Sequence, residues 1–335
     1  MPNKRVFYAC QGVYLQAPHD APTLKTMLTG VQSVGINTNF NLEQVFELGQ
    51  ISIYENIEGI PDVEVTMEKV FDGHGLIFPK ACVGAAADTL VSRSKERCLV
   101  ALGIFDDGLD AIANDPNNTS DFEIQMDGLY VSNISYSFPT DGNFTESISF
   151  VGNSKTINNA ALVRNGNIAG GGTDMTIFDG THTPPNIAAG KGGIQRRENL
   201  DTVATRLPTE LPGVAVNGQL GTAKIQSINI STDFGREDIF ELGSRAPYYR
   251  APNFPIEVTI DIEMIALSTD GINAAEETEN LTEQEIKIVT EDGKIFDLKD
   301  KNRLSSVTYG GGDAAGGQAT CTYSYTNFND LTISG

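Results

Sequence analysis

One stretch of this chain occurs twice, at an offset of 194 residues. Residues 31–50 read VQSVGINTNFNLEQVFELGQ, and residues 225–244 read IQSINISTDFGREDIFELGS, with no gap between them. Ten of the twenty aligned pairs are identical, and three more exchange Val for Ile. Repeats of 20–50 residues would predict a solenoid. An offset near 194 in a chain of 335 residues instead predicts two copies of one whole domain, an arrangement that suits a ring of like subunits.

The repeat continues into two segments that alternate apolar and polar residues. After a slip, VEVTMEKV at 63–70 aligns with IEVTIDIE at 256–263. Alternation with a period of two predicts strands that bury one face only. The other face of both strands is acidic, and its residues are Glu64, Glu68, Glu257, Asp261 and Glu263.

Hairpins are predicted at corresponding places in each copy. The two repeated segments run into loops rich in Gly and Pro before the alternating strands, which predicts a hairpin with a long tip in each copy. Residues 129–152 and 302–328 read as a second pair of hairpins. Segments 85–99 and 274–285 are each expected to form a short amphipathic helix. The chain is therefore predicted to be mainly β, with two tandem domains of the β-sandwich or barrel-forming kind.

The predicted domains are residues 1–152 and 196–335. Residues 153–195 contain GNIAGGG, THTPP and AAGKGG, so they are expected to be a linker or an extended arm. Each domain is long enough to bury a core of its own. No apolar run approaches the length of a membrane helix, and the N-terminus lacks the apolar stretch of a secretory signal.

Charge and cysteine content narrow the class of protein. The chain has 44 acidic and 23 basic residues, for a net charge of −21, whereas a protein that grips nucleic acid needs clustered Lys and Arg. The acidity fits either simple solubility or a surface that must not hold DNA. Four scattered cysteines without a Cys-x-x-Cys pair favour reduced thiols over disulfides or zinc.

No catalytic or cofactor site is expected. The acidic segments 105–110 and 115–121 lack EF-hand spacing and read as solvated loops rather than calcium sites, and the same holds for Asp174 and Asp179. The Gly-rich segment 310–317 is followed by neither Lys-Ser/Thr nor a helix, so a hairpin loop is favoured over a phosphate site. Cys98 is expected to be a buried helix thiol. A pair of carboxylates across a cleft remains open, although the absence of Trp argues against a carbohydrate-active protein.

Four segments together resemble the major tail tube proteins of tailed phages, in their long form with two tandem tube domains. These segments are 32–73, 192–213, 225–266 and 301–333. The resemblance implies a β-sandwich-like core with a small helix in each domain, and a sheet donated to a continuous barrel around a channel. It further implies a ring of three chains with six similar domains, stacked into a tube, and no enzymatic activity.

The resemblance also implies loops that reach the neighbouring ring, at about 46–61 and 240–255. The residues expected in these contacts are Phe46, Leu48, Gly49, Tyr54, Phe240, Leu242, Gly243 and Tyr248. An alternative is that the apolar members close each hairpin onto its own core. Partners implied in the virion tail are other copies of the chain, and the sheath, tape measure and tail terminator proteins. Assembly would take place in the host cytoplasm.

The acidic strand faces connect composition with this role. Burying unpaired carboxylates is costly, so the apolar face must pack on the core. In a closed barrel the acidic face would then line the channel, where it repels DNA phosphates over a distance screened beyond ~8 Å. DNA would pass without specific binding. The alternatives are acids on an outer face that only keep the chain soluble, another duplicated tail protein such as a tube cap or baseplate ring component, or a carbohydrate-active β-sandwich.

Overall fold

The computed structural model describes residues 6, 8–17, 26–49, 51–105, 120–159, 193–244, 246–267, 271–272, 282–312 and 317–334. Strands dominate these residues, which confirms the prediction of a mainly β protein. The predicted helix at 274–285 and the acidic segments 106–110 and 115–119 lie mostly or wholly outside the described residues, as do Asp174 and Asp179.

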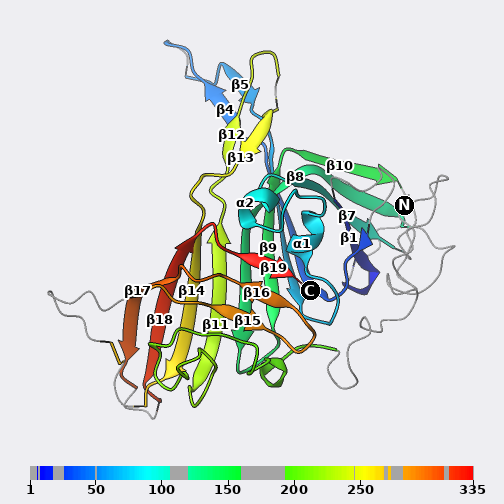
Figure 1. Cartoon of the computed structure of the whole chain (residues 1–335). Helices are drawn as coiled ribbons and strands as arrows, with labels where there is room; N and C mark the ends of the chain where they lie inside the picture. Colours follow the sequence, from blue (N-terminus) through cyan, green and yellow to red (C-terminus); the bar gives the residue numbers. More distant parts are fainter. Residues whose placement is uncertain are drawn as a thin grey trace.

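A single antiparallel sheet runs through both copies of the repeat (Figure 1). Its first half belongs to the first copy and its second half to the second, and the two halves meet where β8 pairs with β11. In spatial order the strands are β3 (Val31–Asn39), β6 (Asp62–Val70), β9 (Thr145–Gly152), β8 (Phe122–Pro139), β11 (Ile225–Asp233), β14 (Glu257–Ile265), β18 (Thr320–Phe328) and β17 (Arg303–Gly310).

The long strand β8 belongs to two sheet regions. Its C-terminal half is the middle of the main sheet, and its N-terminal half starts a branch. The branch consists of β10 (Ser154–Asn159), the first half of β8, β7 (Arg97–Ile104), β1 (Gln11–Gln16) and β2 (Thr26–Met27), with a 3-10 helix at Tyr8–Cys10 before β1. Residues 154–159, which were assigned to the linker or arm, are therefore a strand of the first copy.

One face of the main sheet is covered by short elements (Figure 1). They are α1 (Ile77–Ala81), α2 (Leu90–Arg93) and a small sheet of β15 (Lys287–Val289), β16 (Ile295–Asp297) and β19 (Thr332–Ser334), with a further 3-10 helix at Arg197–Asn199. The predicted helix at 85–99 is wrong except over α2, because residues 97–104 form the buried strand β7. Cys98 is accordingly buried in a strand and not in a helix.

The apolar residues of both copies form one buried core. Phe296 of β16, in the second copy, packs against Phe71, Tyr136 and Phe138 of the first, with ring centroids 4.8–5.8 Å apart. The largest buried cluster contains strand residues from both halves of the main sheet. The expectation of a separate core in each copy is therefore wrong, because the second copy's small sheet closes over the first copy's strands.

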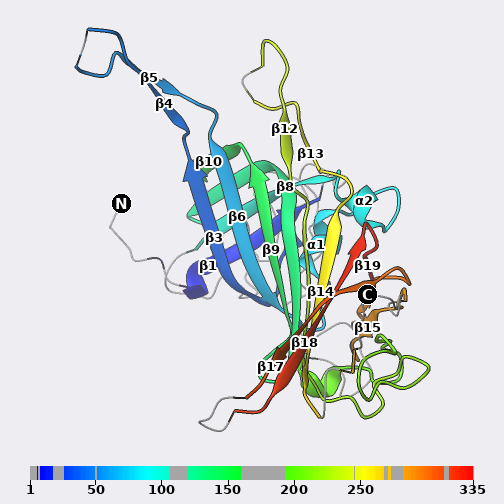
Figure 2. The same ribbon diagram turned by 90° about the vertical axis from the view of Figure 1, so that its left-hand side faces the viewer.

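Two hairpin arms project from the same end of the main sheet (Figure 2). The first-copy arm consists of β4 (Leu42–Val45) and β5 (Glu55–Glu58), and the second-copy arm of β12 (Glu237–Ile239) and β13 (Tyr249–Ala251). Both arms were predicted from the sequence as hairpins with long tips. The other two predicted hairpins are also present, as β8–β9 and β17–β18.

Candidate assembly interface

The two halves of the main sheet match strand for strand, down to their irregularities. A β-bulge between Val31 and Ser33 in β3 recurs 194 residues later between Ile225 and Ser227 in β11. A second bulge between Val131 and Asn133 in β8 recurs 173 residues later between Leu304 and Ser306 in β17. Conserved bulges fix register, so β3, β6, β9 and β8 are the counterparts of β11, β14, β18 and β17.

This register corrects the alignment of the alternating strands. Glu68 pairs with Ser33 and Glu263 pairs with Ser227, so the two acids are equivalent at an offset of 195 and residues 63–70 match 258–265. The sequence alignment with 256–263 was therefore two residues out. A shift of two leaves every side chain on the same face of a strand, which is why the sequence pattern did not reveal it.

The β8–β11 junction shows how one copy of the repeat joins the next. Seven residue pairs align the strands, from Ser227 opposite Pro139 to Asp233 opposite Asn133. On the core face, Ile228, Ile230 and Thr232 of β11 are buried. On the other face the Ser137 hydroxyl donates to the Asn229 side-chain oxygen at 2.7 Å.

The two edge strands of the main sheet, β3 and β17, are the counterparts of the junction strands β11 and β8. Within the described residues, β3 pairs only with β6 and β17 only with β18. Phe40, just after β3, is 62% exposed, whereas its counterpart Phe234 is 0% exposed. Tyr309 of β17 is 52% exposed, whereas its counterpart Tyr136 is 0% exposed. The edges thus leave in solvent two aromatic residues whose counterparts pack against the other copy, Phe234 against Phe78 and Tyr136 against Phe296.

The predicted inter-ring residues all lie on the two arms and are exposed. Gly49 and Gly243 adopt φ of 96° and 91°, so both tips begin with the same left-handed turn, a conformation that favours glycine. The amides of Tyr54 and Tyr248 donate to the carbonyls of Val45 and Ile239 at 2.9 and 2.8 Å. Leu48 and Leu242 are fully exposed, and Phe46 and Phe240 are more than half exposed. The alternative that these residues close onto the core is wrong, because the arms carry them away from it.

The two arms differ in how they are held at the base. In the second-copy arm, Arg236 donates from Nε to the carbonyl of Val131 at 2.8 Å and its guanidinium lies 5.2 Å from the Tyr130 ring. Burial lowers the pKa of Arg236 to about 10, so the group remains charged at neutral pH. Tyr249 meets Tyr130 edge to face at 5.7 Å, and Arg250 pairs with Asp62 at 3.0 Å. In the first-copy arm, the strands β4 and β5 pair with each other.

The predicted acidic residues lie on the open face of the main sheet. Along β6 the burial alternates from Asp62 to Lys69, with Glu64 and Glu68 exposed and Val63, Val65 and Met67 buried. Along β14, Glu257 is exposed, and Asp261 and Glu263 are half-buried among strand hydroxyls. Ser324 donates to Asp261 at 2.6 Å, and Ser227 donates to Glu263 at 3.3 Å. In the described strands, Arg303 at the β17 edge is the one basic residue on this face.

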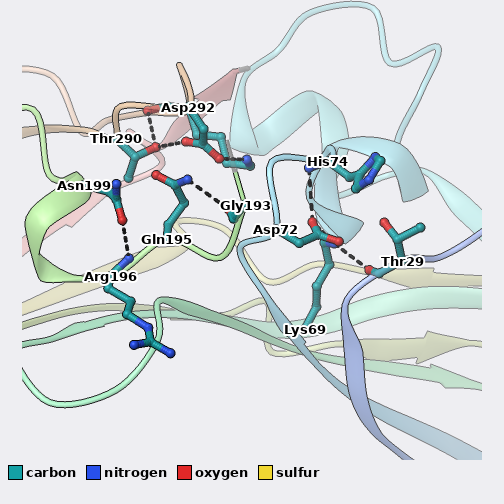
Figure 3. Close-up of polar contacts among 11 residues, drawn as sticks. Thr29, Lys69, Asp72, His74, Gly193, Gln195, Arg196, Asn199, Thr290 and Asp292 are labelled. Atoms are coloured by element: carbon teal, nitrogen blue, oxygen red, sulfur yellow. Dashed lines mark hydrogen bonds and ion pairs between the residues drawn. The ribbon is translucent and has the colours of Figure 1, made fainter. Parts of the chain in front are cut away.

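Buried polar contacts beneath the core face have a structural role (Figure 3). The Lys69 ammonium donates to the carbonyl of Thr29 at 2.6 Å and to Asp72 at 2.7 Å. Burial acts to raise the pKa of Asp72, but the charge and hydrogen bond of Lys69, together with His74, outweigh burial and lower the pKa of that carboxyl. Nearby, Asp292 contacts Thr290 and Lys294. These pairs are satisfied within the fold and leave no group directed at a ligand.

Glu146 fastens α1 to the sheet. Its two carboxylate oxygens accept from the amides of Ile77 and Phe78 at 2.6 and 3.0 Å, and the Tyr136 hydroxyl donates to it at 3.1 Å. Burial raises the pKa of Glu146, while the two amides oppose that shift. The carboxylate therefore supplies the first turn of α1 with the acceptor that the helix itself lacks.

The described part of the chain holds neither a group of metal ligands nor a helix that could span a membrane. No group of three or more His, Cys, Asp or Glu residues there is placed to hold a metal ion. No helix among these residues is long and apolar enough to cross a membrane. All four cysteines are buried, and none of them forms a disulfide.

Comparisons with known proteins include a loose likeness to a solved structure. No family model matches the chain, and no curated protein matches it. Among solved structures, it is similar to a chain in "Cryo-EM structure of the anti-feeding prophage (AFP) baseplate, 6-fold symmetrised", with 6% identity and a TM-score of 0.32. The match covers 47% of this chain and 97% of that one. At this TM-score the likeness assigns neither fold family nor function.

Proposed function

We propose that this protein is a structural subunit of a phage tail that joins edge to edge with copies of itself, forming closed rings that stack into a tube for DNA. The observation that carries the proposal is the β8–β11 junction. One chain already contains the contact between one repeat and the next, and its two free edges are the strands needed to repeat that contact between chains.

The internal junction defines the register of the contact between chains. The offsets of 194 and 173 convert the pair Ser231–Ser135 into Asn37 opposite Thr308, and the pair Ile230–Tyr136 into Ile36 opposite Tyr309. In this register β17 of one copy covers β3 of the next. Phe40 and Tyr309 then become buried like Phe234 and Tyr136, and both unpaired strand edges disappear.

A ring of three chains follows if each junction turns the sheet by the same angle, since a head-to-tail contact that closes gives a cyclic oligomer. Each chain contributes eight strands to the main sheet. Three chains give about 24 strands, and at a spacing of roughly 4.8 Å and a tilt of about 40° the barrel is about 48 Å across between backbones. Such a barrel leaves room for a DNA duplex.

The open face of the sheet would line this barrel, because the other face is occupied by α1, α2 and the small sheet (Figure 1). Its lining would be hydroxyls, amides and the acids Glu64, Glu68, Glu257, Asp261 and Glu263. Acids cannot form ion pairs with phosphates, so DNA would slide past without being held. The arms would reach the next ring, and the role is structural rather than catalytic.

Cysteine cross-linking tests the ring directly. We expect the pair Asn37→Cys and Thr308→Cys in one chain to give covalent trimers on oxidation, with no larger species in denaturing gels. The equivalent internal pair, Ser135→Cys and Ser231→Cys, should cross-link within the chain and give no oligomers. An out-of-register pair, Asn37→Cys and Gly310→Cys, should react far less.

The products decide between the alternatives. A covalent hexamer would indicate a ring of six chains instead of three. A ladder of cross-linked species without an upper size would indicate an open filament. A protein that stays monomeric under negative-stain microscopy and gives no cross-links would refute the proposed function. Compact monomers are also the result expected for a carbohydrate-active β-sandwich.

A further inference from the structure

We propose that the first-copy arm, β4–β5, docks on β17 of the neighbouring chain in the ring. There Glu55 forms an ion pair with Arg303 of that chain. This inference rests on the proposed ring and identifies what holds the arm across the boundary between chains. In the isolated chain the β4–β5 arm stands away from the β12–β13 arm (Figure 2), and β4 and β5 pair only with each other.

The second-copy arm shows what docking requires. It lies against β8 through Tyr249, which meets the Tyr130 ring at 5.7 Å, and through Arg236, whose guanidinium lies 5.2 Å from the same ring. Arg236 also donates to the Val131 carbonyl at 2.8 Å. The second-copy arm is therefore held mainly through Tyr130, which lies just before the bulge in β8.

The registers identify the residues that take these places between chains. Val45 pairs with Glu55 in the first arm, and Ile239 pairs with Tyr249 in the second, so Glu55 occupies the position of Tyr249. Tyr130 lies opposite Val151 and Arg303 lies opposite Thr326, one step before the shared bulge, so Arg303 occupies the position of Tyr130. The aromatic pair of the internal junction thus becomes an acid and a base in the junction between chains.

Both residues are placed to accept this contact. Glu55 is exposed on β5. The Arg303 side chain is 65% exposed, and its ion pair with Glu283 is long at 3.7 Å. The position of Arg236 in the first arm is taken by Leu42, so that arm carries no cation to repel Arg303. Docking of the second-copy arm on β17 would bring Arg236 against Arg303, and this repulsion opposes the wrong pairing.

The test exchanges the two charges. We expect Arg303→Glu and Glu55→Arg each to lower the yield of rings roughly tenfold or more, because a small loss is repeated at each of three junctions. The double variant, with the charges exchanged, should restore rings. Glu43→Arg is the matched control, since Glu43 is an exposed acid on the same arm, and it should assemble as the original protein does.

Ring yield is measured by sedimentation velocity and negative-stain microscopy, with circular dichroism to confirm folding of each variant. A double variant no better than the single variants, or a Glu55→Arg variant with an unchanged yield, would overturn the ion pair while the ring stands. Absence of rings from the unaltered protein would overturn the ring itself. Raising the salt concentration should lower the yield of rings for the original protein and for the double variant alike, because exposed ion pairs are screened.

Discussion

Phe40 and Phe234 are the same residue of the repeat in two different environments, which makes them a matched pair for a test of the ring. Phe234 is fully buried at the internal junction, where its ring packs 6.1 Å from Phe78. Phe40 is 62% exposed beside the free edge of β3. Replacing Phe234 by Ala should destabilise the folded chain by about 3–5 kcal/mol, as for other buried Phe residues. Replacing Phe40 should change that stability by about 0.5 kcal/mol or less.

The effect on assembly should be the reverse for Phe40. Fully burying a Phe side chain is worth about 1.5–3 kcal/mol, so covering the exposed part of Phe40 contributes about 1–2 kcal/mol at each junction. Three junctions in a closed ring give about 3–6 kcal/mol, which is roughly a 10²- to 10⁴-fold loss in ring formation for Phe40→Ala.

Two measurements separate these effects. Urea unfolding of dilute, unassembled protein gives the stability of each variant, and sedimentation velocity over a range of concentrations gives the yield of rings. Phe40→Ala should match the original protein in the first and fail in the second. A Phe40→Ala variant that unfolds as easily as Phe234→Ala, or that forms rings at unchanged concentration, would refute the reasoning.

Three further predictions concern other parts of the molecule. Deleting residues 51–58, which removes part of the tip of the first arm and all of β5 with Glu55, should leave a folded protein that no longer forms long tubes, as seen by negative-stain microscopy; long tubes would exclude a stacking role for this arm. Replacing Glu64, Glu257 and Asp261 by Lys should permit assembly but slow genome ejection, measured as DNA release from reconstituted particles, because Lys side chains bind phosphates; ejection at the normal rate would argue that these side chains do not face the channel. Burial raises the pKa of the Cys82 thiol to about 12, so iodoacetamide at pH 8 should label it slowly in the native protein and rapidly in denaturant; fast native labelling would show that α1 opens readily.

The elements that could be predicted from the sequence are those set by local pattern. Strict alternation along 63–68 and 257–264 determines which face of β6 and β14 is buried, whatever the strands pair with. The arms follow from apolar runs interrupted by Gly and Pro. The predicted helix at 85–99 is wrong at its C-terminal end because residues 97–99 begin the strand β7. This strand pairs with the distant strands β1 and β8, and a local pattern cannot show such a pairing.

The candidate interface lay beyond the sequence for a different reason. Phe40 and Phe234 are the same residue type at aligned positions of the repeat, and only the three-dimensional order of the strands reveals that one is covered and the other is not. Likewise, Tyr130 and Arg303 are counterparts only through the shared bulge, since they are not similar in type. Offsets of 194, 195 and 173 in successive strands also conceal this equivalence from an ungapped comparison.

Duplication within one chain explains why the two arms have diverged. In a ring built from single-repeat chains, every junction would be the same contact. Any substitution in that contact would then change all junctions of the ring at once. In this chain the internal junction is intramolecular, and its contact through Tyr249, Arg236 and Tyr130 forms on folding without loss of translational freedom. The junction between chains must instead form by association, where complementary charges such as Glu55 and Arg303 raise the rate of encounter and reject the wrong arm. Folding followed by assembly therefore favours two different contacts. The contact inside the chain is aromatic and buried, and the contact between chains is charged and exposed.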